Sequence, residues 1–285
     1  MPELPEVETV SQGLQQRALG RRILAVDIRH AGVIAGSPQQ FASELEGRSI
    51  ASIRRKGKVL ALELAAEKEP ARYLLVRLGM TGQFTVIEPE TPLESHTHVL
   101  LTLDGRQEMR FRDVRRFGRL RSCTGAEMET IFNRLGPDAQ QVTWEQFLAA
   151  MRARRGAVKS WLMNQQLIAG IGNIYADESL FAAGIHPLAQ PGRISRNKGR
   201  RLFRAVRKIL DHAVRLQGTS FRDYVDIEGR PGNYEPQLRV YQRDGEPCPR
   251  CRRTIRRIVV AGRSSHFCPS CQPRPRYARM PGSRR

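Results

Sequence analysis

In the first half of the chain, apolar residues occur in short runs bounded by polar or turn-forming residues. The clearest of these runs cover residues 59–64, 73–78, 98–103 and 109–112. The last two flank Asp104-Gly105, a pair typical of a tight hairpin turn. Because several short strands follow one another with turn signals between them, residues 23–121 are expected to form an antiparallel sandwich. A helix over residues 6–19 is expected to precede it.

Beyond residue 141 the spacing of apolar residues becomes helical. One helix is predicted from Trp144, Phe147, Leu148 and Met151. A second is predicted from Leu202, Val206, Ile209, Ala213 and Leu216. These positions follow the pattern of one buried helix face. The opposite face of the second helix carries Arg196, Lys198, Arg200, Arg201, Arg204, Arg207 and Lys208. That face is either ordinary solvated charge or part of a surface that tracks phosphates.

The charge balance points to a polyanionic partner. The 285 residues include 48 Lys and Arg against 28 Asp and Glu, which gives a net charge of +20. Such an excess favours nucleic acid or an anionic membrane surface. No apolar run approaches the ~18 residues of a membrane span, and the N-terminus lacks the apolar segment of a signal peptide. A cytoplasmic nucleic-acid-binding protein is expected; a generally basic surface is the alternative.

Two Cys-x-x-Cys pairs predict a metal site. Cys248 with Cys251 and Cys268 with Cys271 are separated by 16 residues, inside the spacing of a four-cysteine zinc ribbon. Since protein thiolates fill all four tetrahedral positions, one zinc ion is expected to be structural, not catalytic. Disulfides are the alternative, which a cytosolic location disfavours. Cys123 has no partner motif and is expected to be a small core residue.

The opening residues Pro2 and Glu3 carry candidate chemistry. Removal of Met1 would leave a secondary amine that condenses with the masked aldehyde at C1′ of deoxyribose to give a cationic iminium. An unperturbed α-amine titrates near pKa ~8, so a neutral fraction exists at neutral pH. The alternative is a plain helix start, because proline and acidic residues are both favoured in a first turn.

Several blocks of sequence, taken together and in order, resemble the formamidopyrimidine-DNA glycosylase family. The resemblance covers nearly the whole chain, up to the cysteine pairs. The blocks are PELPEVET at 2–9, RRKGK at 54–58, LGMTG at 78–82, DVRRFG at 113–118, WLM at 161–163 and GIGNIYA at 170–176. It implies an enzyme of base excision repair that excises 8-oxoguanine and formamidopyrimidines and then cuts the strand at the abasic site by β,δ-elimination.

The resemblance also implies the catalytic residues. Pro2 matches the nucleophile that attacks C1′, and Glu3 matches the acid/base that protonates the deoxyribose ring oxygen. Lys58 matches the lysine of β-elimination, although from the residues alone it is an ordinary basic strand residue. Arg263 matches the arginine of δ-elimination, where it would clamp the leaving phosphate because it does not give up its proton. Glu6 would order the site by hydrogen bonding.

A base inside a duplex must be flipped out, and the gap must be filled. Met80, Arg115 and Phe117 match the residues that fill this gap in the family; core packing is the alternative for Met80 and Phe117. The implied phosphate contacts are His96, Arg154, Lys159 and Asn173. The chain departs from the family at Val114, where proline is usual, and at Arg154, where lysine is frequent.

The fold class expected is α+β. The expected parts are a catalytic β-sandwich domain at 1–125, a linker at 126–140, a helix–two-turn–helix DNA-binding domain at 141–235, a zinc-ribbon hairpin at 236–272 and a disordered basic tail at 273–285. A monomer that binds double-stranded DNA with oxidised bases or abasic sites is expected, in the bacterial cytoplasm and on the nucleoid. Two rival functions are an endonuclease VIII-like glycosylase for oxidised pyrimidines and a non-catalytic zinc-ribbon damage sensor.

Overall fold

The computed structural model describes residues 2–152, 155–221 and 223–277. The chain divides into two compact units. The first comprises the chain up to Arg134 together with Ala213–Glu235; the second comprises Leu135–His212 and the chain from Pro236 onward. The first unit is therefore built from two separate stretches of sequence. The domain limits that the sequence indicates stay a prediction.

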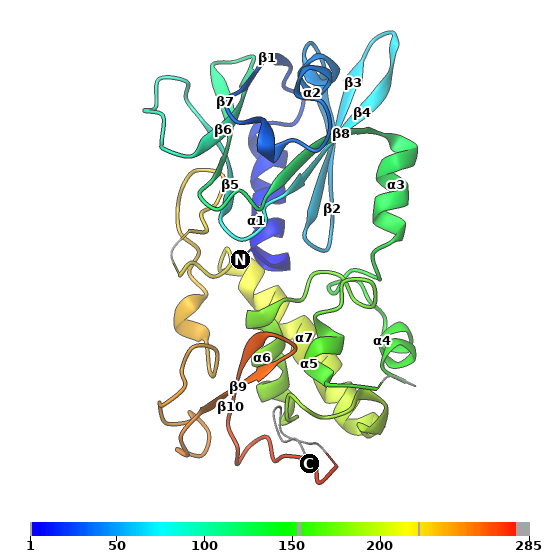
Figure 1. Cartoon of the computed structure of the whole chain (residues 1–285), viewed down its shortest axis with the longest axis vertical. Helices are drawn as coiled ribbons and strands as arrows, with labels where there is room; N and C mark the ends of the chain where they lie inside the picture. The colour runs from blue at the N-terminus through cyan, green and yellow to red at the C-terminus, as the bar shows by residue number, and fades with distance from the viewer. Residues whose placement is uncertain (1, 153–154, 222, 278–285) are drawn as a thin grey trace. The chain divides into compact units, whose positions relative to one another are not determined.

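Two four-stranded antiparallel sheets form the body of the first unit (Figure 1). One sheet has the order β1-β6-β7-β5, and its strands are β1 Ile23–Ile28, β5 Gly82–Ile87, β6 Thr97–Leu103 and β7 Gln107–Asp113. The other has the order β2-β3-β4-β8, and its strands are β2 Ser49–Lys56, β3 Val59–Ala66, β4 Glu69–Arg77 and β8 Arg119–Thr124. Helix α1 (Leu4–Arg17) buries Val7, Val10 and Leu14 in the apolar core that both sheets share. The expected antiparallel sandwich is confirmed.

Some local features differ from the sequence-based expectation. Helix α1 begins at Leu4, before residue 6, because Glu3 acts as its N-cap. Two further helices occur, α2 (Pro38–Leu45) and α3 (Gly125–Asn133). Helix α3 lies in the stretch expected to be a linker. A Thr124–Glu127 capping box starts it, and burial of its apolar side chains holds it in place.

The second unit contains the expected helices and the hairpin. Its helices are α4 Trp144–Met151, α5 Val158–Leu162, α6 Asn173–Ala183 and α7 Arg196–Arg215, and its strands are β9 Arg256–Val260 and β10 Arg263–Phe267. The end of α7, from Ala213, belongs to the first unit. An aromatic cluster joins α4, α5 and α7, with the Phe147 ring centroid 5.1 Å from that of Trp161 and 5.4 Å from that of Phe203. Phe147 and Met151 in α4, and Leu202, Val206 and Ala213 in α7, are buried, which confirms the apolar faces that the helical periodicity predicts.

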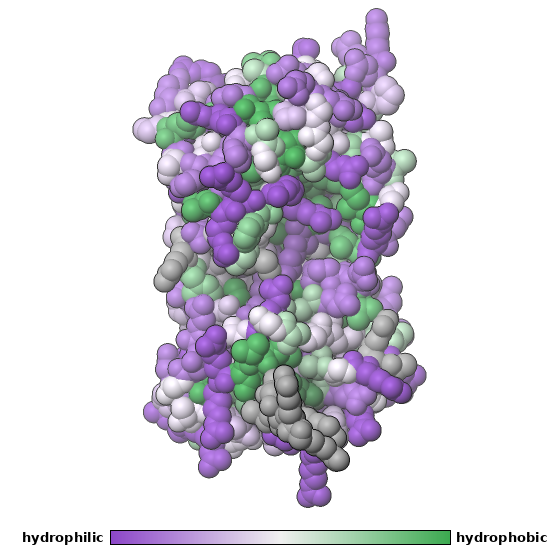
Figure 2. All heavy atoms as spheres, viewed as in Figure 1, coloured by the Kyte–Doolittle hydropathy of each residue, from purple (hydrophilic) through white to green (hydrophobic). Residues whose placement is uncertain are grey.

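The surface agrees with the charged composition. Hydrophilic residues cover most of the face shown in Figure 2. Among the described residues, no helix is long and apolar enough to cross a membrane. Of the expected tail, Tyr277 lies against Arg193, whose guanidinium carbon is 4.7 Å from the ring centroid; residues 278–285 lie outside the described part of the chain.

Candidate active site and nucleic-acid interface

The N-terminal end of α1 is buried and fixed by hydrogen bonds. Glu3 and Glu6 are each 1% exposed. The Glu3 backbone N–H donates to Glu6 Oε2 at 2.7 Å, so the backbone next to Pro2 is held in one place. Glu6 Oε1 also accepts the Thr219 N–H at 2.8 Å. One carboxylate thus joins the start of the chain to the segment 213–235, and the ordering by Glu6 that the sequence suggests has a geometric basis.

The loop that follows α7 packs closely on Glu6. Gly218 has a φ of +84°, and a Cβ there would lie 2.8 Å from Glu6 Oε1, so only glycine fits. The Tyr224 hydroxyl donates to the Glu6 carbonyl at 3.3 Å. Burial raises the pKa of Tyr224 far above its usual range, so the phenol stays protonated and remains a donor. The loop is therefore matched to the N-terminus of α1.

Lys58 lies in the tight turn between β2 and β3, next to Gly57 at φ +57°. Arg55 secures this turn to α1, because its guanidinium pairs with Glu8 and donates to the Gly57 carbonyl at 3.0 Å. The Arg55 side chain is 6% exposed. The turn that carries Lys58 and the helix that carries Glu3 are thus connected by one buried ion pair.

Met80, Arg115 and Phe117 lie on two adjacent loops of the first unit. The side chains of Met80 and Phe117 are 37% and 53% exposed, which contradicts core packing as their role. The Arg115 guanidinium carbon is 4.7 Å from the centre of the Phe117 ring. The loops touch so closely that a Cβ on Gly79 would lie 2.6 Å from the Gly118 nitrogen. The exposed apolar side chains of Met80 and Phe117 therefore lie on the same pair of loops as the positively charged guanidinium group of Arg115.

The fully buried Asp113 holds the loop that carries Arg115 and Phe117. Its Oδ2 accepts the Gly118 N–H at 2.7 Å, its Oδ1 accepts the Arg115 N–H at 3.2 Å, and Thr81 donates a hydroxyl to Oδ1. These bonds fix the loop with Val114 in it, where the resemblance leads one to expect proline. His96 is exposed, in a turn with φ +65°, and its carbonyl accepts the Asp113 N–H at 3.0 Å.

In the second unit, Lys159 is buried. Its side chain is 1% exposed, and its Nζ lies 2.7 Å from Asp177 Oδ1 and donates to the Ser264 carbonyl at 2.5 Å. The phosphate contact that the sequence suggests for Lys159 stays a prediction, since here the ammonium points to protein groups. Asn173, the first residue of α6, donates from Nδ2 to Ser264 Oγ at 3.5 Å.

Asp177 joins α6 to strand β10. Its carboxylate accepts the Ser265 hydroxyl at 3.0 Å and the His266 N–H at 2.8 Å, in addition to the Lys159 ion pair. The neighbouring Glu178 accepts backbone N–H groups of Arg239, Val240 and Tyr241. Burial raises the pKa of Glu178. These two acids of α6 therefore hold the chain before the first cysteine pair and strand β10 just before the second.

Replacing Asp177 with asparagine should destabilise the second unit strongly. The change leaves the Lys159 ammonium buried without its counter-charge, which costs ~3–5 kcal/mol. Replacing Lys159 with methionine as well should recover much of this loss, because the unpaired charge is then gone. Chemical denaturation of the single and double variants measures both effects. Equal stability of Asp177→Asn and the unchanged protein would contradict this account of the pair.

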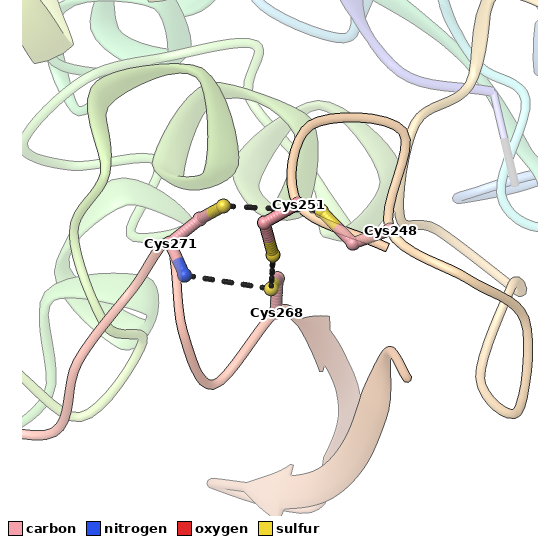
Figure 3. A group of neighbouring side chains, drawn as sticks. All are labelled: Cys248, Cys251, Cys268 and Cys271. Atoms are coloured by element: carbon pink, nitrogen blue, oxygen red, sulfur yellow. Dashed lines mark hydrogen bonds between the residues drawn. The ribbon is translucent and has the colours of Figure 1, made fainter. Parts of the chain in front are cut away.

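The four cysteines that the sequence pairs lie together at the end of the hairpin (Figure 3). Their Sγ atoms lie within 4.8 Å of one another. Cys248 and Cys271 are 3.9 Å apart and Cys251 and Cys268 are 3.4 Å apart between sulfurs. Tetrahedral zinc with Zn–S bonds of ~2.3 Å requires sulfurs ~3.8 Å apart. The cluster therefore fits one structural zinc ion, and a pair of disulfides does not account for it.

Arg263 is exposed at the start of β10. A two-residue turn precedes it, in which Ala261 and Gly262 have φ of +48° and +75° and Val260 pairs with Arg263. Positive φ at both turn residues matches the twist of a hairpin. The turn thus presents Arg263 at its tip, on a strand that Asp177 and the cysteine cluster both hold. Arg154 lies outside the described residues.

Sequence reasoning missed three groups that support these residues: Asp113, the Arg55–Glu8 pair and the Lys159–Asp177 pair. For Asp177, a signal was present, since Asp177 and Glu178 stand side by side in a helix whose other residues are mostly apolar. For Asp113, only its place before two arginines hinted at a role. Its partner Thr81 is 32 residues away in sequence, so the connection required the fold.

Three stretches of the chain match models of known protein families. Residues 1–120 match the family described as the formamidopyrimidine-DNA glycosylase N-terminal domain. Residues 135–225 match the H2TH domain of the same glycosylase. Residues 245–274 match a zinc finger found in FPG and IleRS, in agreement with the zinc site that the sulfur geometry supports.

The chain is similar to whole bacterial proteins. It is 43% identical over 275 residues to the formamidopyrimidine-DNA glycosylase of Solibacter usitatus, covering 96% of this chain and 100% of the relative. The one from Stenotrophomonas maltophilia (strain R551-3) is 41% identical over 274 residues, covering 95% and 100%.

Solved structures with the same fold hold DNA. A Lactococcus lactis FPG mutant in complex with a Fapy-dG containing DNA has a TM-score of 0.89 at 32% identity, covering 96% of this chain and 100% of that chain. The Lactococcus lactis Fpg with an abasic site containing DNA has a TM-score of 0.88, with 95% and 100% covered. From these matches along nearly its whole length, the chain belongs to the formamidopyrimidine-DNA glycosylase family.

Proposed function

We propose that this chain excises oxidised purines from double-stranded DNA in base excision repair, with Pro2 as the nucleophile. Membership of the family supports the glycosylase activity, and the lyase activity is implied by the family. One observation supports the site most directly: the Glu6 carboxylate fixes the backbone beside Pro2 and the loop at Thr219 at the same time. A nucleophile carried on the first residue of a processed chain requires such an anchor.

In the proposed reaction, the neutral Pro2 nitrogen forms a bond to C1′ while the glycosidic bond breaks and its electron pair leaves with the base. The proton of the Pro2 nitrogen passes to the departing base, which leaves neutral. Glu3 then gives a proton to the ring oxygen, and the opened sugar carries an iminium with Pro2. Burial of Glu3 at 1% exposure keeps bulk water from this carboxyl group. Lys58 serves the β-elimination, and Arg263 holds the phosphate that leaves in the δ-elimination.

The remaining site residues are proposed to hold the DNA. Met80 and Phe117 fill the space that the extruded base leaves, and Arg115 pairs with the orphaned base. The proposed phosphate contacts are His96, Arg154, Lys159 and Asn173. Lys159 also supports the Arg263 hairpin through the Ser264 carbonyl. We propose further that the enzyme acts as a monomer on the bacterial nucleoid.

A second candidate substrate is an oxidised pyrimidine. The Lactococcus lactis Fpg has been solved with an oxidized pyrimidine containing DNA, and that structure has a TM-score of 0.88 to this chain. The exposed wedge of Phe117 and Met80 does not distinguish the two base classes, because it fills the gap and does not contact the extruded base. A second class of lesion therefore belongs among the substrates to be tested.

Incubation with borohydride and duplexes that contain 8-oxoguanine, a formamidopyrimidine or an oxidised pyrimidine tests this function. The purine lesions should give a covalent protein–DNA adduct whose sequenced peptide begins at Pro2. A preference for the pyrimidine duplex would favour the endonuclease VIII-like function. Tight binding of every lesion with no adduct would favour the damage sensor.

Replacing Asp113 with asparagine should lower excision from duplex DNA about tenfold. The amide nitrogen cannot accept the Gly118 N–H, and an unsatisfied buried donor costs ~1–3 kcal/mol, which loosens the loop that carries Phe117. Cleavage of a single-stranded abasic substrate should be unchanged, because no gap has to be filled there. Single-turnover kinetics measure both rates, with exposed Asp27→Asn as the control. Equal losses on both substrates would show that Asp113 does not act through the loop.

A further inference from the structure

The outer side of α7 is strongly basic. Its core side buries Leu202, Val206 and Leu210. The opposite side carries exposed basic residues, here called the α7 basic face: Arg196, Arg200, Arg201, Arg204, Arg207 and Lys208. At 100° per residue these six positions fall within one arc opposite the core. All six belong to the second unit. The site described above uses none of them.

Little negative charge balances this face. Asp211 is the only acidic residue in α7, and its Oδ1 accepts a hydrogen bond from Gln140 at 3.3 Å. Among the described residues, no ion pair reaches any of the six basic side chains. Elsewhere the arginines of this chain are commonly paired, as Arg54 is with Glu129 and Arg243 with Glu246. The face is therefore a surface whose charge the described protein does not compensate.

Two of the guanidinium groups are held in place by aromatic rings. Arg200 lies 5.2 Å from the ring centre of Trp144, and Arg207 lies 5.9 Å from that of Phe203. Arginines supported in this way lose less conformational freedom when they bind a phosphate. Two arginines of the α7 basic face, Arg200 and Arg207, are thus held against aromatic rings.

The spacing suits a duplex. Arg196, Arg200, Arg204 and Lys208 follow one another by four residues, so their Cα atoms rise by ~6 Å per step and span ~18 Å along the helix. Double-stranded DNA carries one phosphate per ~1.7 Å of its axis. A row of cations over such a length, which winds by about 40° per step, meets several phosphates and needs no base contact. A second copy of this chain does not fit, because it would bring like charges together.

We propose that the α7 basic face is a second, sequence-independent binding surface for duplex DNA, separate from the lesion site. It binds the phosphates of undamaged DNA while a lesion occupies the catalytic residues. Such a contact lets the enzyme keep hold of neighbouring DNA during the reaction.

The test uses the full-length protein trapped by borohydride on a short lesion duplex, which occupies the lesion site. Binding of a second, fluorescent, undamaged duplex to this adduct is then measured over a range of salt concentrations. We expect binding whose affinity falls steeply with salt. In the variant Arg201→Gln/Arg204→Gln/Lys208→Gln, the slope of log K against log salt should weaken by about 2 to 3, and affinity at low salt should fall at least about tenfold.

The control variant Arg29→Gln/Lys68→Gln/Arg106→Gln removes the same charge from exposed residues of the first unit and should bind the second duplex as the unchanged protein does. Both variants should form the first adduct at the normal rate. Adduct formation without any second binding, or equal losses in both variants, would overturn the proposal. Binding of phosphatidylglycerol vesicles in place of the duplex would also overturn it. Failure to form the adduct at all would instead overturn the proposed function.

Discussion

Replacing Pro2 with glycine should reduce borohydride trapping on an 8-oxoguanine duplex by at least about a hundredfold. The substitution exchanges a secondary amine held in a fixed ring for a primary amine on a freely rotating residue. The nucleophile then loses both its placement beside Glu3 and its direct route to the cationic iminium. Quantifying the adduct by gel and mapping the modified peptide by mass spectrometry measure the effect.

Two controls distinguish loss of the Pro2 secondary amine from a general disturbance of the fold. Pro5→Ala changes a proline in the first turn of the same helix and should leave trapping within a few-fold of normal. A preparation that retains Met1 should fail to trap although its sequence is otherwise unchanged, because the Pro2 nitrogen is then an amide. An adduct of normal yield that maps to Lys58 in the glycine variant would refute Pro2 as the nucleophile.

Replacing Cys268 with serine should release zinc and abolish DNA binding. Cys268 is fully buried, and its sulfur lies 3.4 Å from that of Cys251. Structural zinc contributes ~10–16 kcal/mol in small zinc-binding folds, more than such a segment gains from its own core. The hairpin that presents Arg263 should therefore unfold. Zinc content by mass spectrometry and duplex affinity measure the two effects.

Cys123→Ala is the matched control for the zinc experiment. Cys123 is also fully buried, and burial raises the pKa of its thiol to about 11, so it remains a neutral core group, as the sequence suggests. This variant should keep one zinc and normal DNA binding. Normal affinity of Cys268→Ser after zinc loss would mean that the hairpin does not depend on the metal.

Local sequence signals predicted the elements that depend on near neighbours. The two Cys-x-x-Cys pairs placed the metal cluster, and short apolar runs bounded by turn-forming residues placed β3, β4, β6 and β7. Helices α2 and α3 are short, so periodicity did not reveal them, although Ser37-Pro38 and the Thr124–Glu127 capping box mark where they start. These two helices could have been predicted from their caps.

Groups whose partners lie far away in sequence could not be predicted. The family resemblance implied a phosphate contact for Lys159, yet the side chain is buried and pairs with Asp177, 18 residues later. Arg55 and Glu8 are 47 residues apart, and nothing in either stretch indicates the other. Such pairs arise only when the fold brings two elements together. For this reason the sequence and its resemblance to a known family indicated the candidate catalytic residues, but not the residues that support them.

The bond between Glu6 and Thr219 has a consequence for synthesis of the chain. The two residues are separated by 213 positions, and the first unit needs the segment 213–235 to be complete. On the ribosome, the amino terminus emerges first, but its partner emerges only after most of the chain has been made. A truncated product that ends at Arg134 has both sheets and lacks this anchor. The anchor of the N-terminal helix thus forms only after Thr219 has been synthesised, which ties its assembly to completion of the helices that precede Thr219.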